Sequence, residues 1–242
     1  MKVYKKLIIL VMSSTSKQEY LELEQSIKDT WYNLKTEEVE IIFYKDNQNL
    51  QEKQNYPVFN GFDLVLPIED GFYTLNQKTL MAFEWVCQNY EFDYIYRSNL
   101  GAFVDIKNMI SFLNDKPKEK FYCGIFGFDE FYFGRPMKFV SGSGYFLSKD
   151  LVFLCLQNLH QWPWRVVDDV ALGYILIELN GIEPSKEGLR KDICDDTICY
   201  VKGDKFVEYL NDDLIYHYRI RSDNRKQDIA KMKEIYKKIT TV

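Results

Sequence analysis

The sequence predicts an α/β fold in which a mainly parallel, twisted sheet is flanked by helices. Residues 3–12 end in an unbroken run of Leu, Ile and Val, which is typical of a strand buried on both faces of a parallel sheet. Residues 17–34 place apolar side chains at helical spacing. Strand-like and helix-like segments then alternate along the chain. No repeat or Pro/Gly/Ser-rich linker divides the sequence, so residues 1–242 are expected to form one domain.

The first two strands and the helix between them are the clearest predicted elements. The apolar positions of the helix over 17–34 are Tyr20, Leu21, Leu23, Ile27, Trp31 and Leu34. Val39–Tyr44 is expected to be the second strand because five of its six residues are apolar or aromatic. Residues 45–62 are polar and rich in turn-forming residues, so they are expected to form a loop.

Four further elements complete the alternation. A short strand is expected at Asp63–Pro67, and a helix is expected over Leu75–Tyr90, where apolar residues recur every three to four positions. Tyr94–Arg97 is expected to be a strand, and Ile106–Asn114 a helix. This βαβα order favours a sheet with helices on its faces.

The second half of the chain is less regular. Residues 121–135 are crowded with aromatic residues and glycines, and Phe139–Leu147 is expected to be a strand with a Gly-x-Gly kink. Asp168–Leu179 is expected to be a helix that starts at two carboxylates, and 183–200 to be loop and short strand. Residues 222–239 have the pattern of a basic amphipathic helix.

Composition excludes several classes of protein. The formal net charge is −5 and no basic stretch dominates, so neither nucleic acid nor an anionic membrane is an expected partner. The apolar run Leu7–Met12 is too short for a membrane span, and no transmembrane segment is expected. The five cysteines match no zinc module and are interpreted as reduced thiols of a cytoplasmic protein. The two histidines exclude a site with many His ligands.

Three segments contain residues that could bind a ligand or take part in catalysis. Ser13 and Ser14 follow the first strand, where a parallel sheet opens towards ligands, although an ordinary polar turn would look the same. Gly142 and Gly144 flank Ser143 within a strand, which indicates either a close backbone approach by a ligand or a kink that the fold needs. The third segment is a pair of carboxylates.

Asp168 and Asp169 are the strongest chemical signal. Adjacent carboxylates at a helix start are partly explained by the helix dipole and by capping. They also suit a general base that removes a proton from a hydroxyl nucleophile. Both interpretations remain open at the level of sequence.

Four segments in order resemble the β-1,3-glycosyltransferase family that includes Fringe-like and β-1,3-galactosyltransferase enzymes. They are Ile27–Trp31 (IKDTW), Tyr73–Leu80 (YTLNQKTL), Phe139–Ser148 (FVSGSGYFLS) and Asp168–Gly173 (DDVALG). The family's versions are IRxTW, NLTxKT, GxGYxxS and (E/D)DVxxG. Each motif alone is weak, but four at suitable spacing are more specific. The resemblance spans about residues 3–180 and implies a GT-A fold.

The resemblance implies a function and a division of the domain. The implied enzyme transfers a sugar, with inversion, from a nucleotide-diphosphate donor such as a UDP-sugar to a hydroxyl of a carbohydrate acceptor. Its nucleotide-binding half would be about 1–105 and its acceptor half about 106–221, followed by a C-terminal helix at 222–240. The site would be centred on 94–105 and 140–173.

The resemblance also implies roles for individual residues. Asp169 would be the base, and Asp168 would orient or assist it. Lys28 stands where the family usually has an Arg near the nucleotide, so it keeps the charge without the bidentate fork. Lys78 would lie near the diphosphate, and the strand around Ser143 would face the donor sugar. A solvated Lys28 and a surface Lys78 are the alternatives.

One motif of the family is missing. The three acidic positions that hold a divalent ion fall on Asn99, Leu100 and Gly101, so no carboxylate stands there. We favour a metal-independent enzyme in which fixed cations and polar groups bind the diphosphate. Arg97, Asn99, His217 and Arg219 are expected, by resemblance or by charge, to bind the diphosphate or its sugar. Arg221 could equally be a solvated surface residue.

Two alternatives stay open. An ion, Mn²⁺ or Mg²⁺, could bind through His217 and a carboxylate such as Asp105. The protein could instead be a catalytically inactive sugar- or nucleotide-binding protein on the same scaffold. A nucleotidyltransferase is disfavoured because no glycine-rich basic loop follows the first strand. A cytoplasmic protein of bacterial or viral origin is expected, and the sequence does not predict its oligomeric state.

Overall fold

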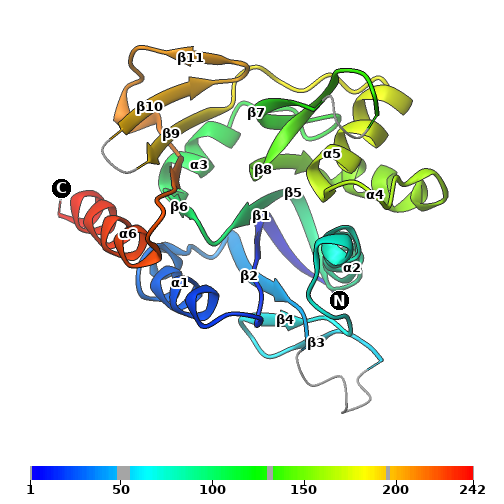
Figure 1. The fold of residues 1–242 in the computed structure, drawn as a ribbon, viewed down its shortest axis with the longest axis horizontal. Helices are drawn as coiled ribbons and strands as arrows, with labels where there is room; N and C mark the ends of the chain where they lie inside the picture. Colours follow the sequence, from blue (N-terminus) through cyan, green and yellow to red (C-terminus); the bar gives the residue numbers. More distant parts are fainter. Residues whose placement is uncertain (1, 48–54, 130–132, 195–196, 242) are drawn as a thin grey trace.

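The computed structural model describes residues 2–47, 55–129, 133–194 and 197–241, and its core is a seven-stranded mixed sheet (Figure 1). The strand order is β3-β4-β2-β1-β5-β8-β7. The strands are β1 (Val3–Met12), β2 (Val39–Lys45), β3 (Val58–Phe59), β4 (Asp63–Val65), β5 (Tyr90–Asn99), β7 (Tyr122–Asp129) and β8 (Met137–Ser148). The run β4-β2-β1-β5 is parallel, whereas β3, β8 and β7 pair antiparallel to their neighbours.

Helices cover both faces of this sheet (Figure 1). One face carries α2 (Leu75–Asn89), α4 (Lys149–Gln157) and α5 (Asp168–Gly173), and the other carries α1 (Gln18–Asp29), α3 (Ile106–Leu113) and α6 (Arg225–Thr240). The remaining helical turns are Trp31–Leu34, Phe72–Thr74, Leu159–Gln161, the π-helical Tyr174–Leu179, and Asp212–Leu214. No helix in the described parts of the chain is both long and apolar enough to cross a membrane.

Strand β1 shows why a buried parallel strand reads as a continuous apolar run. Leu7, Ile9 and Val11 pack into the core on the α1 side, and Ile8 and Leu10 into the core on the α2 side. Because successive side chains point to opposite faces, a strand covered on both faces must be apolar at every position. These five side chains are fully buried.

A second sheet of five strands lies beside the carboxyl end of the first sheet. Its strands are β6 (Ala102–Val104), β9 (Leu189–Cys194), β10 (Thr197–Lys202), β11 (Lys205–Val207) and β12 (His217–Ile220), in the order β11-β10-β9-β12-β6. Strand β6 follows β5 after a two-residue turn, so the chain itself ties the two sheets together at residues 100–101. The segment 183–200, expected to be loop and short strand, contains β9 and most of β10.

The structure confirms the predicted α/β class and the parallel part of its sheet, and it differs in several elements. The helix expected over 17–34 ends at Asp29, because Thr30 has φ −121° and ψ −108° and a 3₁₀ turn follows. The helix expected at 168–179 becomes π-helical from Tyr174. The second sheet and α4 were not predicted, and part of the loop at 45–62 lies outside the described residues.

Replacement of Gly144 by Ala is expected to destabilise the protein. The added Cβ would lie 2.1 Å from the hydroxyl of Tyr96 and 2.3 Å from Nδ1 of His217, two buried groups on the neighbouring strands β5 and β12. Overpacking of this kind costs roughly 1–3 kcal/mol. In Gly71→Ala, the matched control, the nearest atom is 3.6 Å away. Urea unfolding measures both variants, and equal stabilities would contradict the expectation.

Candidate active site

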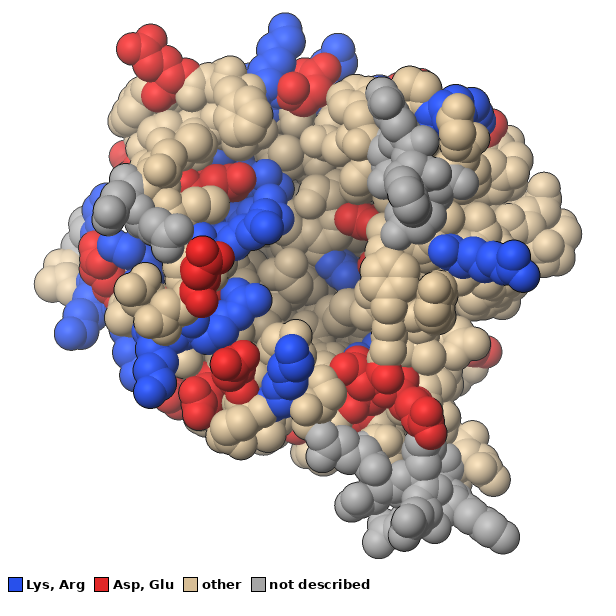
Figure 2. All heavy atoms as spheres, in the orientation of Figure 1, with Lys and Arg blue, Asp and Glu red and all other residues tan. Residues whose placement is uncertain are grey.

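A pocket of about 550 Å³ opens at the carboxyl ends of β1 and β5, where the two sheets meet. Its described lining is Met12, Ser13, Ser14, Tyr20, Leu23, Asp70, Gly71, Phe72, Leu75, Lys78, Asn99, Leu100, Gly101, Arg219, Ile220, Arg221 and Arg225. Figure 2 shows a hollow on this face, with Lys and Arg side chains gathered on the side nearest β9 and α6. Parallel sheets bind ligands at this edge, so the pocket is the first candidate for a substrate site.

One wall of the pocket is cationic. Alternation along β12 and beyond places His217, Arg219 and Arg221 on one side, and Arg225 reaches the same pocket from the start of α6. Within the described parts of the chain, the guanidinium of Arg219 makes no hydrogen bond or ion pair. Burial and the neighbouring charge of Arg190 lower the pKa of Arg219. A guanidinium group without a hydrogen-bond or ion-pair partner among the described residues suits an anionic ligand.

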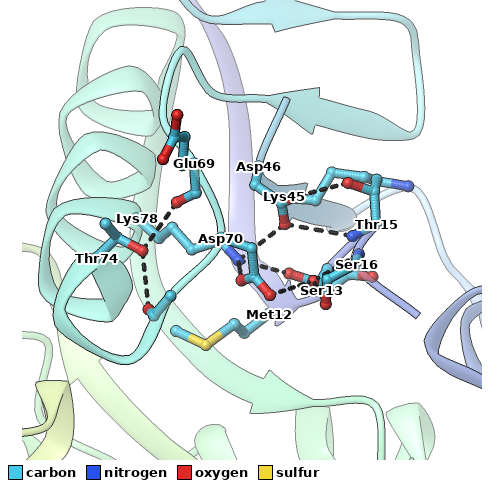
Figure 3. Close-up of polar contacts among 12 residues, drawn as sticks. Met12, Ser13, Thr15, Ser16, Lys45, Asp46, Glu69, Asp70, Thr74 and Lys78 are labelled. Carbon is cyan, nitrogen blue, oxygen red and sulfur yellow. Dashed lines mark hydrogen bonds and ion pairs between the residues drawn. The ribbon is translucent and has the colours of Figure 1, made fainter. Parts of the chain in front are cut away.

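The opposite wall contains Lys78, and its charge is already neutralised (Figure 3). Its Nζ donates to Asp46 at 3.1 Å, to Asp70 at 2.8 Å and to the carbonyl of Ser13 at 3.1 Å. An ammonium group has three N–H donors, so all of them are used. Lys78 therefore holds the Ser13 loop and Asp70 at the pocket edge, and the diphosphate role that the resemblance implies is not available to it in this conformation.

The remaining predicted residues of the first half separate into two groups. Ser13, Ser14 and Asn99 line the pocket. Ser13 Oγ donates to Glu24 at 2.6 Å, and Ser14 Oγ donates to Asp70 at 2.8 Å. Lys28 is not among the described residues that line the pocket, and its ammonium group forms ion pairs with Glu24 at 2.8 Å and with Asp63 at 3.1 Å.

The two carboxylates at the start of α5 have different surroundings. Asp168 is buried, and its Oδ2 accepts hydrogen bonds from Thr79 and Arg97, both at 2.9 Å. Asp169 is half-buried and accepts from the backbone N–H of Gly142 at 2.7 Å and of Val170 at 2.9 Å. Burial and the charge of Asp168 raise the pKa of Asp169 to about 6. A carboxylate with such a pKa is a suitable general base near neutral pH.

Arg97 lies beneath this site and not in the pocket. Its Nη2 is 2.9 Å from Asp168, and its Nε donates to the hydroxyl of Tyr44 at 3.3 Å. Burial alone would lower the pKa of Arg97, but the Asp168 carboxylate outweighs it and the pKa is raised. The expectation that Arg97 binds the diphosphate therefore has no geometric support, because the ion pair turns this guanidinium towards α5.

The glycine strand β8 brings Asp169 and the second sheet together. A Cβ at Gly142 would lie 2.7 Å from Arg97 Nη1 and 3.0 Å from Asp169 Oδ2, so only glycine allows this approach. Ser143 accepts a hydrogen bond from Arg190 at 2.8 Å, and Arg190 also forms a bidentate pair with Asp192. Sequence reasoning missed Arg190, Arg225 and Asp70. The position of Arg190 depends on β9 of the second sheet, which has only a weak sequence signal, whereas Asp70 lies between β4 and α2 and Arg225 begins α6.

The residues near Asn99 do not fit a divalent-ion site. The side-chain oxygen of Asn99 accepts from the N–H of Gly101 at 3.0 Å, and Asp105 caps α3 through Asn108. His217 is buried, its Nδ1 hydrogen-bonds to Tyr96, and its Nε2 has no partner among the described residues. Burial and the charges of Arg190 and Arg219 lower its pKa well below the usual value.

A cation at His217 would therefore meet arginines instead of carboxylates. The described segments also contain no group of three His, Cys, Asp or Glu side chains that could hold a metal ion. The alternative in which His217 and Asp105 hold Mn²⁺ or Mg²⁺ finds no support in this donor set.

Comparison with known proteins shows the family: the chain belongs to the galactosyltransferase family, whose model matches residues 22–187. Beta-1,3-galactosyltransferase 5 of Pan paniscus is 24% identical over 202 residues, which cover 71% of this chain and 65% of that protein. UDP-GalNAc:beta-1,3-N-acetylgalactosaminyltransferase 1 of Mus musculus is 29% identical over 197 residues, which cover 69% and 59%. The chain thus spans somewhat less than two thirds of these relatives' lengths.

A solved structure confirms the GT-A-type α/β fold. The chain superimposes on a glycosyltransferase involved in the glycosylation of the major capsid of PBCV-1 with a TM-score of 0.56, at 11% identity, over 95% of this chain and 99% of that one. The family match includes Asn99–Gly101 and ends before Arg219, Arg221 and Arg225.

The raised pKa of Asp169 predicts a stability effect that depends on pH. An unfolded aspartate has a pKa of about 3.9, so between about pH 4 and 6 the native protein binds more protons than the unfolded chain. Stability therefore falls as the pH rises through this window. In Asp169→Asn this loss is absent. The free energy of unfolding of the variant should therefore rise, relative to that of the wild type, by on the order of 2 kcal/mol between about pH 4 and pH 7.5.

Urea unfolding at a series of pH values measures this difference. Asp204→Asn is the control, since Asp204 is exposed and makes only a 3.8 Å contact with Lys186. A difference between Asp169→Asn and wild type that does not change with pH would show that the carboxyl group of Asp169 is not perturbed.

Proposed function

We propose that the chain is an inverting glycosyltransferase that uses a nucleoside-diphosphate sugar and a carbohydrate hydroxyl. Two features carry this proposal: Asp169, a half-buried carboxylate whose pKa is raised to about 6, and a pocket with an arginine wall, although Asp169 is not among the described residues that line this pocket. A sugar transferase needs these two features together, a base for the acceptor and positive charge for the leaving diphosphate. A UDP-sugar is the proposed donor because the mouse relative's name specifies UDP-GalNAc.

The proposed chemistry is a single displacement. Asp169 takes the proton of the acceptor hydroxyl while its oxygen forms a bond to the anomeric carbon of the donor sugar. The bond from that carbon to the diphosphate oxygen breaks, and the nucleoside diphosphate leaves with the electron pair. The attack comes from the face opposite the leaving group, so the anomeric configuration inverts. The N–H of Gly142 keeps the carboxylate of Asp169 oriented, 2.7 Å away.

We further propose that the transfer requires no divalent ion. Arg219, Arg221 and Arg225 line the pocket that would hold the diphosphate, and only Arg225 has an ion-pair partner in the described residues, Asp228 at 2.9 Å. Fixed guanidinium groups can stabilise the charge that develops on a leaving phosphate. This proposal accounts for Asn99 at the position where the family places carboxylates.

Asp169→Asn should abolish transfer without abolishing donor binding. Loss of a general base typically lowers kcat by about 10²–10⁴-fold. In the wild type, kcat/KM should fall about tenfold per pH unit below a pKa near 6, because only the ionised carboxylate accepts the proton. The measurements are initial rates with a UDP-sugar panel and calorimetric binding of UDP.

Asp204→Asn, at an exposed turn, should retain full activity in the same assays. Transfer by Asp169→Asn at wild-type rates would refute the mechanism. A wild-type protein that binds nucleotide but turns over no donor with any acceptor offered would instead indicate a binding protein on this scaffold.

Arg219→Met should weaken UDP binding and leave uridine binding unchanged. Loss of a charge-assisted hydrogen bond costs about 1.5–3 kcal/mol, or roughly 10- to 100-fold in Kd. Arg135→Met is the control, because Arg135 is exposed and pairs with Glu178 away from the pocket. Calorimetry with UDP and uridine measures the effect. In the wild type, EDTA should change neither UDP binding nor transfer. A requirement for Mn²⁺ or Mg²⁺ would contradict the proposed role of the arginines.

A further inference from the structure

The pocket has two chemically opposite ends. Three arginines lie at one end, and the other end contains Ser13, Ser14 and Asp70. Asp70 is the only carboxylate among the described residues that line the pocket. Its position is not explained by the diphosphate, which a carboxylate would repel.

Asp70 is held as an ionised acceptor. Its Oδ1 accepts from Lys78 and its Oδ2 from Ser14, both at 2.8 Å. Burial raises the pKa of Asp70, but the hydrogen bonds from Lys78 and Ser14 outweigh this effect and the pKa is lowered. A carboxylate can accept about four hydrogen bonds, so each oxygen keeps capacity for a further donor from a ligand.

An aromatic ring lies next to this carboxylate along the chain. Phe72 lines the same pocket and is 49% exposed, although it is a large apolar residue. Its ring makes a T-shaped contact with Tyr73, with centroids 5.4 Å apart, and about half of Phe72 stays exposed. The flat face of a nucleobase can stack on such a ring.

We propose that Asp70 binds the ribose hydroxyls of the donor nucleotide, with Phe72 as the stacking surface for its base. A ribose diol supplies O–H donors to a carboxylate that can only accept, and the diphosphate then extends towards Arg219 and Arg221. This order of contacts matches the order of groups in a ribonucleoside diphosphate. The inference rests on the proposed function, since it assigns parts of the same donor, and it predicts that the site selects ribonucleotides over 2′-deoxyribonucleotides.

The chain offers a matched control for this role. Asp46 is the second carboxylate bound to Lys78, at 3.1 Å, but it is buried and does not line the pocket. Asp46→Asn and Asp70→Asn each remove one charge from Lys78, so both should lower the melting temperature. Only Asp70→Asn should also change how the protein distinguishes ribose from deoxyribose.

Calorimetric titration with UDP, CDP, ADP and GDP, and with their 2′-deoxy counterparts, tests the proposal. For the ribonucleotide that binds most tightly, wild-type protein should bind the 2′-deoxy form about 10-fold more weakly, since the charged acceptor Asp70 loses a hydrogen-bond donor. In Asp70→Asn the preference should fall to within about 2-fold, and in Asp46→Asn it should persist. The ratio of two affinities in one variant is insensitive to a general loss of folded protein.

The outcomes separate this inference from the proposed function. Equal binding of both sugars by the wild type, or an undiminished preference in Asp70→Asn, would overturn the role of Asp70 while nucleotide binding and transfer remained. If none of the nucleotides binds the wild-type protein, the pocket is not a donor site, and both proposals fail.

Discussion

The buried ion pair between Arg97 and Asp168 is the interaction on which the site depends. It joins β5, in the centre of the first sheet, to the start of α5, at a distance of 2.9 Å. Both side chains are about 5% exposed. Buried charges are costly to desolvate, and removal of one partner of such a pair typically costs 3–5 kcal/mol. The pair therefore fixes where α5 begins, and with it the next residue, Asp169. The same guanidinium leaves no room for a side chain at Gly142, whose N–H orients that carboxylate.

The pattern of apolar residues is sufficient to predict the centre of the first sheet, but not its edge strands β3 and β7. Strands β1 and β2 bury side chains in both cores and are apolar almost throughout, whereas α1 and α2 each bury one apolar face in one core. The second sheet could not be predicted in the same way. Its strands are short, and β12 has only four residues. Its pairing with β6 joins segments more than 110 residues apart, and its pairing with β9 joins segments 27 residues apart.

Two of the predicted site residues come together in the structure, whereas three of the predicted cations are paired with carboxylates. Asp169 and Gly142 were identified separately, and the structure joins them by a hydrogen bond. Lys28, Lys78 and Arg97 were all expected to meet the donor, yet each is neutralised by carboxylates that come from other elements. The partner of a charged side chain is a property of the tertiary structure. A motif can therefore locate a lysine along the chain without showing whether its charge remains free for a ligand.

The arginine wall has a consequence for the end of the proposed reaction. A nucleoside diphosphate carries more negative charge than the sugar nucleotide from which it is made, so fixed cations bind the product more tightly than the substrate. A metal ion can depart together with the product, but Arg219, Arg221 and Arg225 belong to the chain. Release of the diphosphate would then be the slow step of each cycle. The rate of turnover would be set by how quickly the nucleoside diphosphate dissociates from the arginines at the end of β12 and the start of α6.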